Sequence, residues 1–323
     1  MNKEIIYSPY KIAHYKHNLI LGTPVTAHID LTDRCNHRCF FCGSQYQLNF
    51  DYTQELSGEK WVDIIEQLPI QAIVMCGGGD PLMHRSFTTV ARYCLNKGLR
   101  CGLITNGQLW NDEVTKVASK FDWVRISIDA STQETYEKQR GVKDNIQNVF
   151  VRHVPPPVVY GANFVVTKYN FREIADFARI IKLSGFDNCR FVFPFPHDPE
   201  LKGYSNEVIS QLEEAKSHSD DDFTVFASHM ERLTGKEAKN TFTTCYYSSI
   251  ALTIDASGNM YTCCQLKLNQ RGIMGNLLES SFSDIWATRV PPEVSKCQPC
   301  WMAPKNEIAE YIMMENPSHG VFI

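Results

Sequence analysis

Three cysteines lie within eight residues of one another, and their spacing suits metal chemistry. Cys35, Cys39 and Cys42 stand in the run CNHRCFFC, a CxxxCxxC pattern. A structural zinc ion normally takes four protein ligands, and iron–sulfur clusters are held by cysteine thiolates, usually four to a cube. Because no obvious fourth cysteine lies nearby, the run predicts a cube that leaves one iron open to another ligand. A zinc knuckle, or cysteines brought together by chance, are the alternatives.

A glycine-rich turn follows a short apolar run farther along the chain. It consists of Gly77, Gly78, Gly79, Asp80 and Pro81. Consecutive glycines let the backbone turn tightly and let a ligand approach main-chain N–H and C=O groups closely. Taken alone, such a turn is explained equally well as a plain connection between two elements.

Polar residues end the next predicted strands. Thr105 and Asn106 follow one strand, and Ser127 and Asp129 stand at alternate positions at the end of the next, so their side chains point the same way. Arg140 ends the following helix and precedes a glycine. An arginine there can pair bidentately with a carboxylate, or it can be a cation at a helix C-terminus that glycine caps.

A second group of cysteines lies near the C-terminus and includes a CxxC pair. The run Ile254–Tyr261 predicts a hairpin, which would bring the first two of these cysteines together on adjoining strands. The group consists of Cys245, Cys263, Cys264, Cys297 and Cys300. Its spacing suits a four-cysteine zinc site.

Together these motifs resemble those of the radical S-adenosylmethionine (SAM) superfamily. The cysteine run, the GGGDP stretch (usually GGEP in the family), the TNG run at 105–107 and the RG pair at 140–141 carry the resemblance. It implies that SAM binds the open iron of a [4Fe–4S] cluster, with the aromatic residue before the third cysteine beside the adenine. The SAM-binding residues implied are Phe41, Gly77, Gly78, Gly79, Asp80, Pro81, Thr105, Asn106, Ser127, Asp129, Arg140 and Val165. For Val165, a plain core strand would explain the same residue.

The C-terminal cysteines resemble the SPASM/twitch extension of that superfamily, in which cysteines bind an auxiliary [4Fe–4S] cluster. One complete set of four matches the shorter twitch form, as in twitch-bearing aminocyclitol dehydrogenases. If these cysteines bind zinc instead, the segment would have a structural role only. Cys264 is read as an alternative ligand, a packed thiol or a relay near the substrate.

The resemblance implies an enzyme whose reduced cluster cleaves SAM to a 5′-deoxyadenosyl radical, which abstracts a hydrogen atom. The cofactors would be two [4Fe–4S] clusters and SAM, and the partner a one-electron donor such as flavodoxin or ferredoxin. Only 34 residues precede Cys35, which favours a small polar substrate (sugar, aminocyclitol or nucleotide-linked sugar) over a ribosomally made peptide. An iron–sulfur or zinc electron carrier without SAM chemistry is the alternative of another class.

The elements that must position these residues alternate between strand and helix, as in a parallel α/β sheet. Strands are predicted at Val25–Leu31, Ala72–Cys76, Leu99–Ile104, Trp123–Ile128, Val158–Thr167 and Asn188–Phe193. Helices are predicted at Gly58–Leu68, Ser86–Lys97, Asp112–Ser119, Thr132–Gln139 (with Ser131 as N-cap), Phe171–Ser184, Asn206–Lys216 and Thr224–Leu233. Periodicity alone does not distinguish a partial (β/α)6 TIM-like barrel from an open doubly wound sheet. The resemblance favours the barrel.

Composition sets the remaining bounds. A net charge of −4 and a pI near 6.2 argue against nucleic acid as the main partner. No apolar run is long enough to span a membrane, and twelve cysteines without a leader favour a cytoplasmic, reducing compartment. The expected organisation is a lead-in (1–24), a barrel (25–199), a helical bridge (200–244) and an auxiliary-cluster domain with a cysteine-rich core and tail (245–323).

Overall fold

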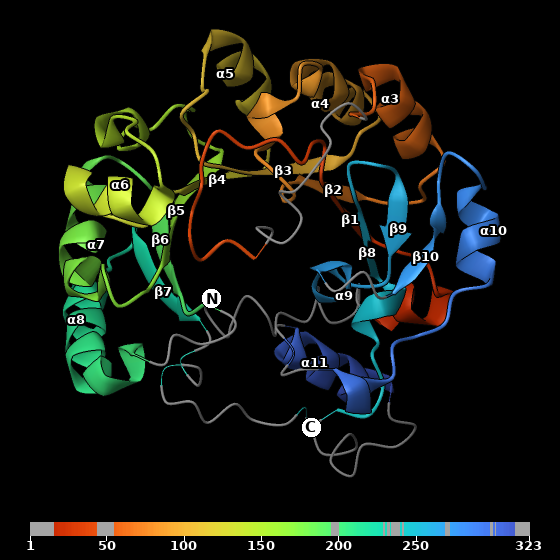
Figure 1. The fold of residues 1–323 in the computed structure, drawn as a ribbon. Helices are drawn as coiled ribbons and strands as arrows, with labels where there is room; N and C mark the ends of the chain where they lie inside the picture. The colour runs from red at the N-terminus through yellow and green to blue at the C-terminus, as the bar shows by residue number, and fades with distance from the viewer. Residues whose placement is uncertain are drawn as a thin grey trace.

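A single mixed sheet organises the chain in the computed structural model (Figure 1). The structure describes residues 16–43, 55–194, 200–228, 230, 233, 240, 242–268, 272–297, 300 and 302–313. Most of the expected lead-in therefore lies outside the described residues. The strands are β1 (Thr26–Ile29), β2 (Ala72–Met75), β3 (Arg100–Thr105), β4 (Trp123–Ser127), β5 (Val159–Val165), β6 (Asn188–Val192), β7 (Thr224–Ser228), β8 (Ala251–Ile254), β9 (Asn259–Tyr261) and β10 (Ile273–Asn276).

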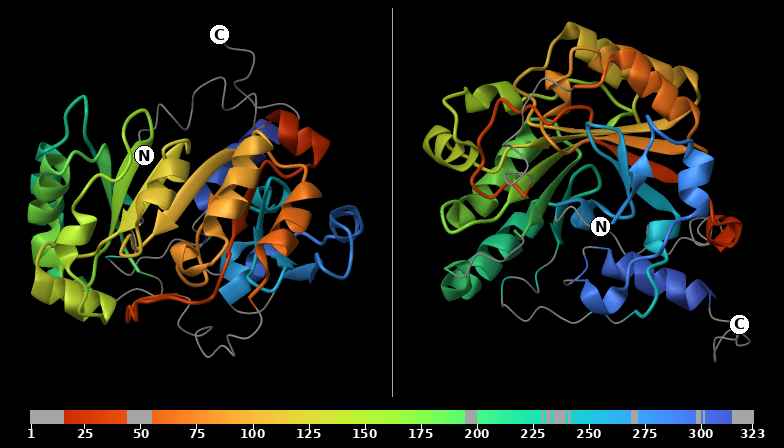
Figure 2. Two further views of the ribbon diagram at one scale, coloured as in Figure 1. Left: turned by 90° about the horizontal axis from the view of Figure 1, so that it is seen from above. Right: turned by 45° about the vertical axis from the view of Figure 1, so that its right-hand side comes forward.

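Strands β1 to β7 lie side by side in sequence order, each parallel to the next. A doubly wound sheet would reverse its strand order at a switch point and carry helices on both faces. Here the order does not reverse, and Figures 1 and 2 show the sheet curving, with the helices that connect these seven strands on its outer face. The predicted partial barrel is therefore confirmed, and the doubly wound alternative is excluded.

The outer helices close the hydrophobic core against the convex face. They are α3 (Gly58–Glu66), α4 (Phe87–Asn96), α5 (Asp112–Ala118), α6 (Gln133–Arg140), α7 (Ile174–Leu183) and α8 (Ser205–Ser217). Helix α3 shows why they form: Ser57 caps its first turn by accepting from the backbone N–H of Lys60, and Trp61, Ile64 and Ile65 on one face are fully buried. The predicted helices agree with these ranges to within a few residues.

Two local expectations at the helices need correction. The N-cap of α6 is Thr132, not Ser131, whose backbone N–H and hydroxyl bond to Glu173 instead. The expected helix over Thr224–Leu233 is wrong at its start, because Thr224–Ser228 form β7. That segment pairs with the edge of β6. As a strand it buries Val225 under α8, and the residues on either side of Val225 face the inside of the barrel.

The C-terminal segment joins the same sheet. Strand β8 lies parallel to β1, and β9 and β10 continue from it as antiparallel strands. The predicted hairpin is confirmed, with its turn at 255–258. However, Cys245 and Cys263 flank β8 and β9 and do not lie on them. The helices here are α9 (Cys264–Leu268), α10 (Phe282–Ala287) and α11 (Ala303–Met313). Among the described residues, no helix is long and apolar enough to cross a membrane.

Candidate functional site

The first cysteine set lies on the loop that follows β1, named here the cysteine loop (residues 30–43). Burial, helped by the negative charges of Cys42 and Cys35, raises the pKa of Cys39 to about 12. Burial also raises the pKa of Cys35, although its sulfur accepts the backbone N–H of His37 at 3.4 Å. The three thiols are thus electrostatic neighbours. Because Cys35 and Cys39 hold their protons tightly, a bound metal cluster would have to displace those protons.

The glycine turn packs directly against the backbone of the cysteine loop. The N–H of Gly79 donates to the carbonyl of Thr32 (2.8 Å), and the N–H of Asp80 donates to the carbonyl of Arg34 (2.8 Å). A Cβ at Gly79 would overlap that same Arg34 carbonyl. The glycine is therefore required by backbone-to-backbone packing, a reason that the sequence did not reveal.

The carboxylate of Asp80 joins the ends of β2 and β3. It accepts from the Thr105 hydroxyl (2.9 Å), the Asn106 backbone N–H (2.6 Å) and the Leu82 backbone N–H (3.0 Å). Burial raises its pKa, and these hydrogen bonds oppose the shift. The Asn106 side chain then donates to the Asn36 side chain at 2.7 Å, which carries the network to the cysteine loop.

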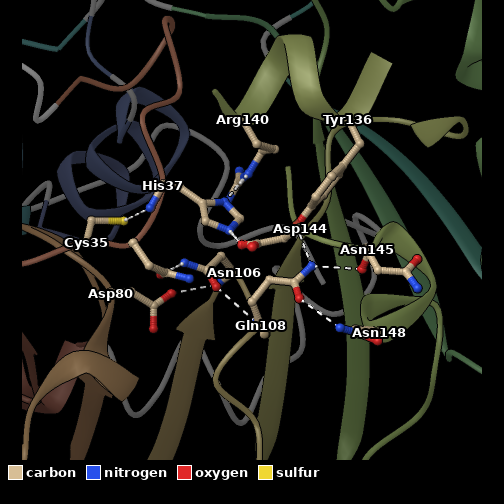
Figure 3. Close-up of polar contacts among 12 residues, drawn as sticks. Cys35, His37, Asp80, Asn106, Gln108, Tyr136, Arg140, Asp144, Asn145 and Asn148 are labelled. Atoms are coloured by element: carbon tan, nitrogen blue, oxygen red, sulfur yellow. Dashed lines mark hydrogen bonds and ion pairs between the residues drawn. The ribbon is translucent and has the colours of Figure 1, made fainter. Parts of the chain in front are cut away.

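Arg140 lies at the centre of a buried polar network (Figure 3). It forms an ion pair with Asp129, and its Nε donates to His37 Nδ1 at 3.0 Å. Because arginine can only donate, His37 Nδ1 carries no proton, so the proton is on Nε2, which faces Asp144 Oδ2 at 3.2 Å. Burial and the charge of Arg140 lower the pKa of His37 to about 3. His37 is therefore a neutral link between helix α6 and the cysteine loop.

Asp129 has an unusual backbone conformation that directs its side chain into this network. Its φ is +68°, the positive value that non-glycine residues seldom adopt. Its Oδ1 accepts the N–H of Val165 at 2.7 Å, and the Asn170 side chain donates to the carbonyls of both residues at 2.8 Å. The strained turn is thus held from three sides, which fixes the carboxylate beside Arg140.

The side chains of three predicted contact residues lie outside this network. Ser127 faces inward from the end of β4, level with Asn163 on β5. Val165 is partly buried at the end of β5, and it joins the network only through its backbone, whose N–H donates to Asp129. The Phe41 ring packs edge-on against Phe40, with ring centroids 5.3 Å apart.

The second cysteine set also gathers in space. The pKa of Cys300 is raised to about 11, first by burial and then by the charges of Cys263, Cys245 and Cys297, so the four thiols are neighbours. A hydrogen bond from Cys264 lowers the pKa of Cys263 to about 6, which makes the leftover thiol a partner of one member of the set. A four-thiol donor set fits an iron–sulfur cluster. Within the described ranges, no three His, Cys, Asp or Glu side chains close around a single ion.

A buried ion pair that the sequence did not reveal lies between the two cysteine sets. Lys267 on α9 pairs with Asp30 at the start of the cysteine loop, and both are about 5% exposed or less. Gly77 leaves room for it, because a Cβ there would overlap the Asp30 carboxylate. Neither residue belongs to a motif. The sequence offers as signals only a lone lysine close behind Cys263 and an aspartate inside the first predicted strand, which in the structure ends at Ile29.

The fold and the site define an α/β barrel with two groups of cysteine thiols, and comparison with known proteins gives the family. The chain belongs to the radical SAM superfamily, whose model matches residues 29–200, more than half of its 323 residues. Residues 245–301 match the SPASM model, an iron–sulfur cluster-binding domain. The cofactors are therefore those of this family: SAM, the [4Fe–4S] cluster that binds it, and auxiliary iron–sulfur chemistry in the C-terminal domain.

The curated relatives of this chain carry names that describe different activities. The chain is 28% identical over 162 residues to an S-adenosylmethionine-dependent nucleotide dehydratase of Selenomonas ruminantium, covering 45% of this chain and 57% of the relative. It is 25% identical over 331 residues to an AdoMet-dependent heme synthase of Nitratidesulfovibrio vulgaris, covering 89% and 88%. It is 23% identical over 292 residues to a sporulation killing factor maturation protein of Bacillus subtilis, covering 84% and 67%. For the first of these, the chain spans little more than half the relative's length.

Solved structures support the fold. Streptococcus suis SuiB bound to the precursor peptide SuiA superposes with a TM-score of 0.64 at 16% identity, over 85% of this chain and 67% of that one. The enzyme anSMEcpe with bound AdoMet gives 0.59 at 17% identity, over 81% and 80%. The expected likeness to twitch-bearing aminocyclitol dehydrogenases is only loosely supported, because the C-terminal match is to the SPASM model.

Proposed function

We propose that this radical SAM enzyme removes a hydrogen atom from a small polar substrate and oxidises or rearranges the product with help from an auxiliary cluster. The observation that carries the proposal is the buried network that joins three strand ends and α6 to the cysteine loop through Asp80, Asn106, Asp129 and Arg140. An electron carrier has no need for such a network at the strand ends. When bound and reduced, the SAM-binding cluster supplies the electron that splits SAM into methionine and a reactive adenosyl group.

The chain's own residues would hold these groups. Cys35, Cys39 and Cys42 would bind the first cluster, and Cys245, Cys263, Cys297 and Cys300 the auxiliary one. Asp80 would contribute to SAM binding by fixing the backbone of the glycine turn, because its carboxylate is already bonded to Thr105 and Asn106. Arg140 would have two roles. It would order the cysteine loop through its hydrogen bond to His37, and its guanidinium would pair with the SAM carboxylate. The other proposed SAM contacts are Phe41, Ser127 and Val165.

A ribosomally made peptide is the second candidate substrate. The specific observation in its favour is the similarity to SuiB, solved with its precursor peptide, and to the killing factor maturation protein. A one-electron donor such as flavodoxin or ferredoxin would be needed with either substrate.

Metal analysis with a SAM-cleavage assay tests the proposal. The chain is reconstituted anaerobically, iron, sulfide and zinc are counted per chain, and 5′-deoxyadenosine is measured on the same sample. We expect about eight irons together with 5′-deoxyadenosine, and expect Cys39→Ala to remain folded but to form none. Normal SAM cleavage by Cys39→Ala would refute the proposal, and about four irons with one zinc would remove the redox role of the C-terminal domain.

A further inference from the structure

The concave face of strands β4 to β7 carries an isolated pair of arginines. Alternate residues of each strand face inward there, because the intervening ones, such as Val124 and Phe191, are part of the outer core. Arg125 on β4 and Arg190 on β6 occupy inward positions two strands apart. No inward position of these four strands holds an aspartate or a glutamate.

Arg125 is held in place by its neighbours but not neutralised. Its guanidinium lies over the Trp123 ring, 5.4 Å from the centroid. That ring covers Gly102 on β3, where a Cβ would overlap it. The Arg125 Nε is buried and has no hydrogen-bond partner. Since a buried donor without a partner is costly, this atom marks a place where an acceptor is expected.

Arg190 and the amides beside it extend the same lining. Its Nε donates to the Ser228 hydroxyl on β7 at 3.0 Å. Asn163 lies beside Arg190 on β5, and Asn188 lies one inward position below on β6. The Oδ1 atoms of both amides are buried and unbonded, and as acceptors they would take hydroxyl or amino donors of a ligand, whereas the arginines would take its anionic group. At full charge the two guanidiniums repel each other, and burial together with the charge of Arg190 lowers the pKa of Arg125 to about 10. Within the described part of the chain, no carboxylate pairs with either arginine.

We propose that Arg125 and Arg190 bind a doubly negative group of the substrate, of the phosphate or pyrophosphate type, inside the barrel. Two cations of fixed, planar geometry without a counter-charge match an anion of charge about −2 that accepts several hydrogen bonds. The inference rests on the proposed function and narrows it. Among small polar substrates it favours a nucleotide-linked sugar, and it disfavours a cationic aminocyclitol.

The position along the strands suits a substrate anchor. Arg125 lies two residues before Ser127 on the same strand, which is about 7 Å deeper in the barrel at about 3.3 Å per residue. The carboxyl ends of the strands carry the predicted SAM contacts. An anion held at this depth would therefore leave the rest of the substrate pointing towards the SAM end.

Calorimetric titration of the anaerobically reconstituted full chain with SAM tests the site. Pyrophosphate is the main probe, and malonate is the second, because a dicarboxylate shares the same chemistry. The variants are Arg125→Gln and Arg190→Gln. Arg92→Gln is the control, because Arg92 is exposed on α4 and pairs with Glu113. Arg125→Lys and Arg190→Lys keep the positive charge, and they replace a glutamine variant in the titration if that variant does not fold.

We expect saturable binding of pyrophosphate that weakens about tenfold to a hundredfold in each glutamine variant, since each loses charge-assisted hydrogen bonds. The affinity of the lysine variants for pyrophosphate should fall several-fold, and the affinity of the control should match that of the wild type. Tighter binding of malonate, with the same losses, would keep the site and assign it to a carboxylate. Absence of binding of both anions by the wild type, or unchanged binding by all variants, would overturn the inference. SAM cleavage on the same samples separates the two proposals, because cleavage without anion binding refutes only this one.

Discussion

Replacing Lys267 by methionine tests whether its ion pair with Asp30 secures the contact between the two cysteine-bearing parts of the chain. The two side chains are only 6% and 3% exposed, so solvent screens the pair little. Removing one member of a buried pair costs about 3–5 kcal/mol, because the other charge stays buried without compensation. Methionine keeps the apolar stem of lysine, so the loss is mainly one of charge. We expect the free energy of unfolding to fall by about 3–5 kcal/mol.

The pH dependence of that loss follows from the Asp30 carboxyl. Burial raises its pKa and Lys267 opposes the shift, so the pKa rises further in the variant. A carboxyl whose folded pKa is raised destabilises the fold fully above that pKa, and the cost disappears as the pH falls below the unfolded value. The loss should therefore be larger at about pH 8 than at about pH 5.

Urea denaturation of the anaerobic protein at both pH values measures the effect. Lys116→Met is the matched control, because Lys116 forms an exposed pair with Glu113 and should give no measurable change. Adding Asp30→Asn to Lys267→Met should recover part of the loss by removing the stranded charge. A variant no less stable than the control, or a loss that is the same at both pH values, would refute the reasoning.

Three further predictions concern the turn and the auxiliary set. Asp80→Glu should lower the free energy of unfolding by about 1–3 kcal/mol in the same titration, because Asp80 is buried and its carboxylate is held by Thr105, so an extra methylene would displace that partner. Gly79→Ala should bind less iron on reconstitution, since its Cβ displaces the Arg34 carbonyl; a normal iron content would contradict this. Cys297→Ala should retain about four of eight irons and still form 5′-deoxyadenosine without completing turnover, and full turnover would make the C-terminal domain purely structural.

The strands and helices of the barrel could be predicted because local pattern and tertiary environment agree in them. The apolar face of α3 and the buried run of β2 are examples, since both bury the residues that their periodicity marks. Strand β7 is the exception, because the polar residues that flank it indicate a surface helix. Its own Thr224, Val225 and Phe226 favour a strand, and pairing with the open edge of β6 stabilises that extended conformation.

The cysteines and polar motif residues of the site could also be found, but their connections could not. His37 is one of the unspecified positions of CxxxCxxC, and its role depends on Arg140, 103 residues away. Asp80 is a motif residue, yet its bonds to Thr105 and Asn106 depend on the register between β2 and β3. Such links join residues distant in sequence, and no local pattern encodes them.

The pairing of β8 with β1 explains how two cysteine sets more than two hundred residues apart keep a fixed relation. The backbone N–H of Asp30 donates to the Ile254 carbonyl at 2.9 Å, which extends the parallel register of the two strands to the start of the cysteine loop. From the other strand of the pair the chain runs through β9 to Cys263 and α9, where Lys267 returns to Asp30. The first set and Cys263 of the second set are thus linked to adjacent strands of one sheet, so the cysteine loop cannot shift without disturbing the backbone that leads to Cys263.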